Sequence, residues 1–260
     1  MGNRRVARIL ITGSSDGLGL MAARLLIEQG HEVVLHGRSG GRSRDALAAA
    51  PRAAGAVTGD LSTIAGARTV ADQVNKLGRL DAVIHNAGVG YREGRVETEP
   101  GLPSVFAVNV LVPYILTALI EKPDRLVYVS SGTHHGVRPR MDDLLWAKRA
   151  LGAAFRPTPR ASFAMCCSPL PSLAAGKTSN PTRWSLAGCR RRWVALQPPT
   201  IFIKAASPRR GSPRAKTSWR DRPAGISIIN GRVRRIASDV NIQEELLAEC
   251  GRISGIPLTN

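Results

Sequence analysis

A short apolar run that leads straight into a glycine-rich loop restricts most strongly how this chain can fold. Residues 7–13, ARILITG, are typical of a buried strand, and further glycines follow at positions 17 and 19. After the glycines, apolar residues recur at helical spacing: Leu20, Ala23, Leu26 and Ile27. A strand, a glycine turn and a helix in this order suit a pyrophosphate, whose charge the helix N-terminus stabilises. A plain flexible turn is the alternative for such a loop on its own.

The alternation of strand and helix continues to about residue 132. Further strands are expected in HEVVLHGRS (31–39), AGAVTGDLS (54–62), LDAVIHNAG (80–88) and RLVYVSSG (125–132). One intervening helix has Val70, Val74 and Leu77 on one face, and a long apolar helix over 103–121 carries Asn109 in its interior. This order implies right-handed crossovers and a parallel sheet. We predict an α/β fold with a Rossmann-type doubly wound sheet, complete through about five strands, whose strand ends collect the ligands.

Five motifs in register resemble those of the short-chain dehydrogenase/reductase family. TGSSDGLG (12–19) is similar to its TGxxxGxG loop, and GDLS, NAG, the helical Asn109 and VSSG follow in the family's order. The resemblance covers residues 6–149, and DDLLWAKR (142–149) looks most like the retinol-dehydrogenase-like and WW-domain-oxidoreductase-like branch. It implies hydride transfer between a nicotinamide cofactor and a small alcohol or carbonyl substrate.

The resemblance also assigns roles to residues. Ser131 would hydrogen-bond the substrate carbonyl, and Asn109 would help hold a proton-relay water; a strand-end cap and a satisfied core amide are the structural alternatives. The second strand ends with His36 and Arg38 where an acidic residue would suit NAD, so Arg38 favours NADP and its 2′-phosphate, although a solvated surface arginine is the alternative. The remaining cofactor-binding residues implied by the resemblance are Gly13, Ser14, Ser15, Gly17, Leu18, Gly19, Asp60, Leu61, Asn86, Ala87 and Gly88.

The positive charge is concentrated in one window of the chain. The net charge is +18, of which residues 151–238 contribute +16, residues 1–150 +5 and residues 239–260 −3. The same window holds ten of the 17 prolines. We therefore divide the chain into a dinucleotide-binding domain (1–150), an anomalous basic segment (151–238) and a family-like tail (239–260), and expect an irregular or disordered C-terminal third.

The tyrosine and lysine of the family's YxxxK pair are missing from the expected place. No tyrosine follows Tyr128 in the sequence. We hypothesise a change of reading frame: taking the third base of each codon with the first two of the next, Pro157–Thr158 permits tyrosine and Ala161–Ser162 permits lysine, four codons apart. In the same phase, residues 180–193 permit NALEPGWVPTKM, which resembles the family's PG segment. The chain as written is expected to be inactive and poorly soluble, because the fifth strand would be an exposed apolar edge.

Two other functions remain open. A non-catalytic NADP-binding protein would fit the complete loop without the tyrosine, and a basic nucleic-acid-binding fusion would fit the arginine and tryptophan of RRRW, although nucleic acid is not the expected partner. No membrane span, metal site or disulfide framework is expected, because the apolar runs are short and the four cysteines form no CxxC pair. We expect a cytoplasmic protein; the intact family fold would form a homo-oligomer, an expectation weakened here by the altered window.

Overall fold

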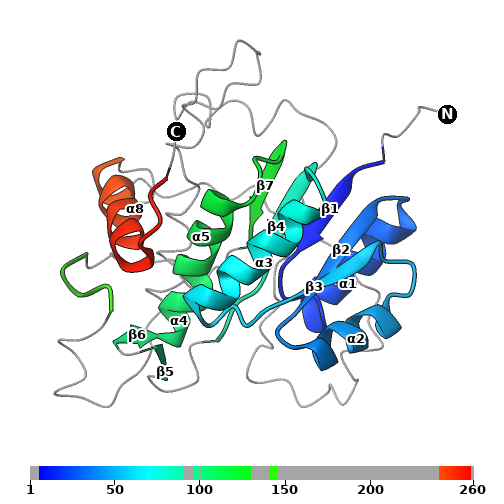
Figure 1. Cartoon of the computed structure of the whole chain (residues 1–260), viewed down its shortest axis with the longest axis horizontal. Coiled ribbons are helices and arrows are strands. Elements are labelled where there is room, and N and C mark those ends of the chain that lie inside the picture. The colour runs from blue at the N-terminus through cyan, green and yellow to red at the C-terminus, as the bar shows by residue number, and fades with distance from the viewer. Residues whose placement is uncertain (1–5, 91–95, 100, 130–140, 146–239, 259–260) are drawn as a thin grey trace, which may run out of the picture.

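A parallel five-stranded sheet forms the centre of the molecule. The computed structural model describes residues 6–90, 96–99, 101–129, 141–145 and 240–258. The strands lie in the order β3–β2–β1–β4–β7 (Figure 1). Their bounds are β1 Arg8–Ile11, β2 Glu32–Gly37, β3 Gly55–Thr58, β4 Ala82–His85 and β7 Arg125–Tyr128. The predicted α/β fold with five parallel strands is confirmed, and all five carboxyl ends lie at one edge of the sheet.

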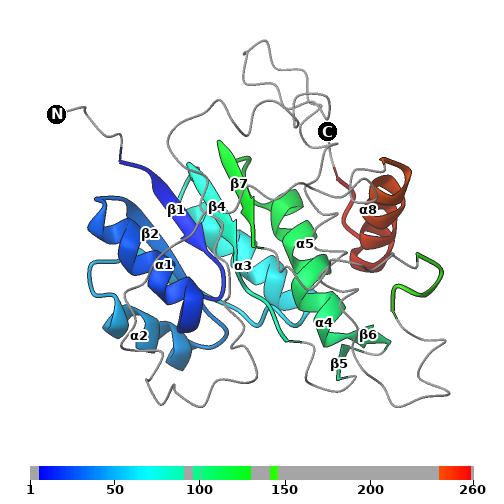
Figure 2. The same ribbon diagram turned by 180° about the vertical axis from the view of Figure 1, so that it is seen from behind.

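Helices cover both faces of this sheet (Figures 1 and 2). One face carries α1 (Gly17–Glu28), and the other carries α3 (Ile64–Lys76) and α5 (Val112–Leu119). The remaining elements are α2 (Gly40–Ala49), the short hairpin β5 (Glu97–Glu99) and β6 (Leu102–Pro103), α4 (Ser104–Phe106), a π-helical turn at Ala107–Leu111, a 3₁₀ turn at Met141–Asp143 and α8 (Val240–Ser254).

Strand residues alternate between two hydrophobic cores, one on each face. Leu10, Val34 and Val83 pack with α3 and α5, whereas Ile9, Ile11 and other residues of alternate position pack with α1 and α2. Because both faces of the sheet are buried, the central strands read as continuous apolar runs instead of alternating with polar residues. The doubly wound arrangement thus follows from the period-two geometry of each strand.

The end of α3 and the C-terminal tail differ from the sequence expectation. The apolar spacing predicts Leu77 on the buried face of α3, but this residue forms the C-cap of that helix and is 45% exposed. The expected tail at 239–260 contains the 15-residue helix α8, which packs against α5 through Leu246 and Cys250. The basic segment 151–238 and its hypothesised change of frame lie outside the described residues.

The described helices include none that is both long and apolar enough to cross a membrane.

Candidate dinucleotide site

The glycine loop connects β1 to α1 at the carboxyl edge of the sheet. Gly13 has a φ of 62° and Gly17 a φ of 54°, values that favour glycine over every other residue. A Cβ at Gly17 would meet no protein atom within 4 Å, so this backbone faces open space. Leu18 and Ser15 are partly buried on either side of it. The loop therefore offers bare backbone to a ligand at the start of α1.

Close packing explains the other two glycines of the loop. A Cβ at Gly13 would lie 2.9 Å from Cα of Ala87, the residue that follows Asn86 at the end of β4. At Gly19 it would collide with the carbonyl oxygen of Gly13 and lie 2.5 Å from Nδ2 of Asn86. Two of the three glycines thus bring the loop, helix and β4 together, while the third is open to solvent.

The N-terminus of α1 has no side-chain cap, unlike those of α2 and α3. Ser39 caps α2 by accepting from the Arg42 amide, and Thr63 caps α3 by accepting from the Gly66 amide. Asp16 at the N-cap of α1 makes no such bond, because its carboxylate instead pairs with the guanidinium of Arg42. The amides of the first turn of α1 are therefore left to an anionic ligand.

Buried side chains hold the loop from below. The Thr12 hydroxyl, 1% exposed, accepts from the amides of Asn86 and Ala87, each at 3.0 Å. The fully buried Ser14 hydroxyl donates to the Ile11 carbonyl at 2.9 Å. The resemblance places Ser14 among the phosphate contacts, but its hydroxyl is committed to the protein interior.

His36 closes this network on the β2 side. Its Nδ1 accepts from the Gly13 amide and its Nε2 lies against the Gly59 carbonyl, both at 3.0 Å. Its own amide donates to the Ser14 hydroxyl at 2.8 Å. Burial lowers the pKa of His36 below the ordinary histidine value, outweighing the raising effects of the Gly59 bond and of Asp60. A role for Thr12 and for the His36 ring in holding the loop was not anticipated from the sequence.

Arg38 follows β2 at the same edge and is exposed. Arg42, four residues on in α2, carries the ion pair to Asp16 and a second one to Asp45 at 3.7 Å. With Arg44, three guanidinium groups belong to the segment that follows β2, and only Arg38 was singled out from the sequence. The pairing of Arg42 with the glycine loop has no sequence signal, because it depends on how α2 packs.

The end of β3 supplies one exposed and one buried residue. Asp60 is exposed, and its carboxylate accepts from the Ser62 amide at 2.9 Å. Leu61 is only 4% exposed and belongs to the core on the α3 side. The backbone at this point carries the Gly59 carbonyl that meets His36.

The end of β4 faces the glycine loop. The Asn86 side-chain amide donates to the carbonyls of Thr12 and Gly13, each at 3.0 Å. Ala87 is partly buried and Gly88 is exposed. Asn86 thus fixes the loop through its side chain, and the predicted ligand contacts of Asn86, Ala87 and Gly88 stay predictions.

Asn109 lies in the π-helical turn, and its side chain binds both backbone groups of Val89, which follows β4. Its Oδ1 accepts from the Val89 amide at 2.9 Å, and its Nδ2 donates to the Val89 carbonyl at 3.1 Å. The side chain is 7% exposed, so the amide is satisfied as a core group while it sets the backbone beyond the strand. Such π turns are frequent at functional sites. Ser131, the other predicted catalytic residue, lies outside the described residues.

Neither tyrosine in the described part of the chain is placed as a proton donor. The Tyr128 hydroxyl shares a 2.8 Å hydrogen bond with Thr117, and burial raises its pKa to about 12. Tyr114 donates to the Ile256 carbonyl at 2.7 Å, and burial also raises its pKa. The family's acid needs the opposite shift. Tyr91, the third tyrosine of the chain, lies outside the described residues.

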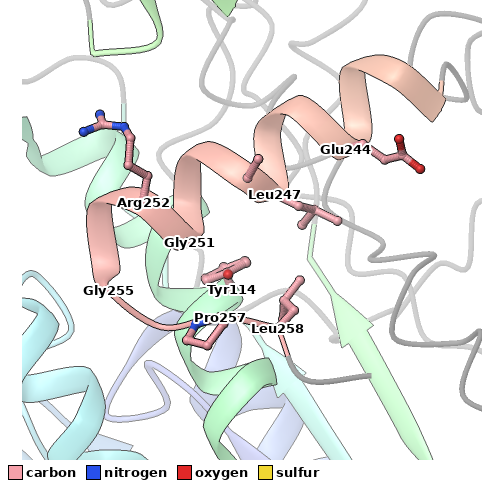
Figure 3. Close-up of a pocket in the computed structure, with 9 residues that line it drawn as sticks. Tyr114, Glu244, Leu247, Gly251, Arg252, Gly255, Pro257 and Leu258 are labelled. Carbon is pink, nitrogen blue, oxygen red and sulfur yellow. The ribbon is translucent and has the colours of Figure 1, made fainter.

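A separate cavity of about 530 Å³ lies between α5 and α8 (Figure 3). Tyr114 lines it from α5, and Leu247, Gly251 and Leu258 line it from α8 and the residues that follow. None of the site residues predicted from the sequence lines this cavity. It is therefore distinct from the edge of the sheet where those residues meet.

Comparison with known proteins supports the assignment of the first half of the chain. A family model described as short chain dehydrogenase matches residues 7–132. An uncharacterized oxidoreductase of Emericella nidulans is 51% identical over 134 residues, 50% of this chain and 52% of the relative. Short-chain dehydrogenase chyC of Penicillium rubens is 44% identical over 144 residues, 55% of each chain. The chain thus matches about half the length of these curated relatives.

One solved structure matches the fold along nearly the whole length. An uncharacterized protein from Mycobacterium Paratuberculosis superposes with a TM-score of 0.65 at 23% identity, covering 98% of this chain and 95% of its own. At this identity the match supports the fold alone.

Proposed function

The chain belongs to the short-chain dehydrogenase/reductase family, and on that premise we propose an oxidoreductase that binds NADP(H) and acts on an alcohol or carbonyl. The observation that carries the proposal is the uncapped N-terminus of α1 beneath an open glycine loop. Gly17 leaves space for a phosphate where any side chain would intrude, and the helix N-terminus favours its negative charge. A dinucleotide therefore fits the residues present.

The bound cofactor would supply the hydride, and the protein would supply position and charge. Thr12, Ser14 and Asn86 hold the loop rigidly, so its amides need not reorganise when they meet the phosphates. Asn109 fixes the backbone at Val89, directly after Asn86, Ala87 and Gly88, which the resemblance places on the ribose and nicotinamide side of the site. Ser131 is proposed to bind the substrate oxygen.

NADP is favoured over NAD by the charge after β2. Arg38 is exposed there and Arg42 lies one helical turn further on, whereas no carboxylate occupies residues 36–44. A guanidinium forms charge-assisted bonds to a phosphate, while a ribose 2′-hydroxyl calls for an acidic acceptor. The His36 ring, bound to Gly13 and Gly59, is not available to the ribose.

Catalysis by the chain as written is proposed to be weak or absent. A positioned general acid contributes about 10² to 10⁴ in rate. The sequence has no tyrosine beyond Tyr128, and both described tyrosines have hydroxyls occupied by protein partners and raised pKa values. A non-catalytic NADP-binding protein is the second candidate function, and this missing acid is the observation that favours it.

Titration of the purified full chain with NADPH and NADH tests the binding proposal. We expect NADPH to bind with micromolar affinity and NADH at least about tenfold more weakly, the value of one charge-assisted bond. A folded chain that binds neither dinucleotide, measured by calorimetry, would contradict the proposal. Equal affinity for the two would contradict the NADP assignment alone.

Turnover and gene sequencing separate the two candidate functions. NADPH oxidation with a panel of aldehydes and ketones should be undetectable with the chain as written. Resequencing the gene across codons 140–245 should reveal insertions or deletions, and the chain from the restored frame should contain the YxxxK pair and reduce a carbonyl. Turnover by the chain as written would overturn the proposed inactivity, and an unaltered gene would favour the non-catalytic NADP-binding protein.

A further inference from the structure

We propose that His36 is a positioning residue for dinucleotide binding, which clamps the glycine loop to the end of β3 so that both cofactor-binding segments are held as one unit. This inference rests on the proposed function, because it assigns His36 a role in the same site. The ring is 3% exposed, so it acts on the ligand through the backbone and not by touching it.

The partners of the ring fix its protonation. The Gly13 amide is a donor, so Nδ1 at 3.0 Å must be an acceptor, and the Gly59 carbonyl is an acceptor, so Nε2 at 3.0 Å must carry the hydrogen. The ring is therefore neutral, with its hydrogen on Nε2. A second proton would place an N–H against the Gly13 N–H and break the bond to the loop.

His36 holds Gly13, a residue that is also hydrogen-bonded to the end of β4. The Gly13 carbonyl accepts from the Asn86 side chain at 3.0 Å, while the Gly13 amide donates to His36. Both polar groups of Gly13, whose φ of 62° already restricts it to glycine, are thereby fixed between β4 and β2. Loss of the His36 bond releases one of these two anchors.

The backbone of His36 strengthens the same connection. Its amide donates to the Ser14 hydroxyl at 2.8 Å, and its carbonyl accepts from the Ser14 amide at 3.2 Å. The strand and the loop therefore stay joined when the ring is replaced. Substitution of the ring should loosen the clamp without unfolding the sheet.

Several charged groups lie on the segments that pack around β2. They are Asp16 in the glycine loop, Asp60 after β3, and Arg42 and Asp45 in α2. Asp60 is the one that favours protonation of the ring, and burial opposes it more strongly. The bond from the Gly13 amide to His36 should consequently persist near neutral pH and break in acid, when the ring takes up a second proton.

Three substitutions separate the two bonds. H36N keeps an oxygen near the position of Nδ1 to accept from Gly13, H36Q keeps an amide near the position of Nε2 to donate to Gly59, and H36L keeps neither. We expect H36L to weaken NADPH binding about tenfold or more, the net value of one to two hydrogen bonds. H36N should recover most of the affinity, and H36Q should recover less. H31N is the matched control, since His31 precedes β2 and accepts from Ala7 far from the loop edge.

A pH profile and hydrogen exchange distinguish positioning from general stability. NADPH affinity of the wild type should fall in acid more steeply than that of H36N, since the titration of the ligand's own phosphate is common to both. Exchange of the Gly13 amide should accelerate in H36L and H36Q but not in H36N. Wild-type affinity in all three variants, parallel pH profiles, or H36Q binding better than H36N would overturn the inference. A folded wild type that binds neither NADPH nor NADH would instead overturn the proposed function.

Discussion

Two histidines of the sheet are equally buried, yet their surroundings differ. His36 on β2 and His85 on β4 are each 3% exposed, and burial lowers the pKa of both. Both ring nitrogens of His36 have backbone partners. In His85, Nε2 shares a hydrogen bond with the side-chain hydroxyl of Thr117 at 3.2 Å, and within the described residues Nδ1 has no hydrogen-bond partner. Equal burial thus leads to a satisfied ring at the glycine loop and an unsatisfied one on the α5 face.

The second histidine belongs to a small polar cluster inside an apolar core. Its ring stacks on Tyr128, with centroids 4.8 Å apart and planes inclined by 19°, and Tyr128 shares Thr117 as a partner. Burial lowers the pKa of His85 to about 3. The comparison teaches that hydrogen-bond partners decide whether a buried ring organises a site, whereas burial lowers the pKa of both rings.

Gly19→Ala is expected to have the largest effect on stability and on NADPH binding, because it disrupts the packing of the glycine loop that His36 holds. The new Cβ collides with the Gly13 carbonyl and the Asn86 amide, and overpacking of this kind costs about 3 kcal/mol in the free energy of unfolding. NADPH binding should be lost as well. Urea unfolding and calorimetry measure both effects.

Gly41→Ala is the matched control for that change. It also adds one methyl to an early helical position, but the nearest atoms lie 3.9 Å away. Its stability should stay within about 0.5 kcal/mol of the wild type, as for most surface substitutions. If the two variants behave alike, the packing account of the loop is wrong.

Thr117→Val tests the polar cluster around His85. It removes the hydroxyl that serves both His85 Nε2 and Tyr128, leaving two buried polar atoms without that partner. The free energy of unfolding should fall by about 2 to 3 kcal/mol, since each unsatisfied group costs about 1 to 3. NADPH affinity of the folded protein should not change. Thr69→Val, which removes an exposed hydroxyl bonded to Ala65, should be nearly neutral, and an equal loss there would contradict the role of the cluster.

The sequence predicted the sheet and the glycine loop better than the side-chain contacts that distinguish His36 from His85. Apolar runs and glycines are local signals, so the five strands, the loop and the interior position of Asn109 could be recognised from the amino-acid pattern alone. The same pattern marks His36 only as the residue found where an acid would suit NAD. The two bonds of its ring join residues 23 positions away on either side, and spacing along the chain does not encode them.

Other features were missed for similar physical reasons. The helix α2 has few apolar residues, and its packing depends on Ser43 and Ala46 rather than on an apolar stripe. The pairing of Asp16 with Arg42 replaces the capping bond that an aspartate in that position usually makes. The stacking of His85 on Tyr128 arises from the register between β4 and β7, which pairs these two residues.

The acid sensitivity of the fold should come in large part from His85. In the unfolded chain this histidine binds a proton near pH 6.5, but in the folded chain it does so only near pH 3, so stability falls as the pH drops below 6.5. Between pH 6.5 and pH 5 the loss should be about 2 kcal/mol. Urea unfolding of His85→Leu should show a flatter profile over this window, whereas His31→Asn should retain the wild-type slope. Parallel profiles for wild type and His85→Leu would show that the ring is not responsible.

Arg38→Ala should have the smallest effect on stability. It tests whether the segment that follows the glycine-loop histidine also selects the cofactor. Arg38 is exposed and lies just beyond the clamped strand, so its loss should leave stability unchanged. Removal of one guanidinium near a 2′-phosphate should weaken NADPH binding about tenfold and leave NADH binding unaltered.

Arg24→Ala supplies the control for Arg38→Ala, because it removes the same charge from the outer side of α1, where Arg24 donates to the Ala49 carbonyl. Calorimetric titration of both variants separates a local contact from the effect of net charge. If Arg24→Ala weakens NADPH as much as Arg38→Ala does, long-range attraction is sufficient and the segment after β2 has no selective role. If only Arg38→Ala discriminates between the two cofactors, the same strand that anchors the loop through His36 also positions the residue that selects the phosphate.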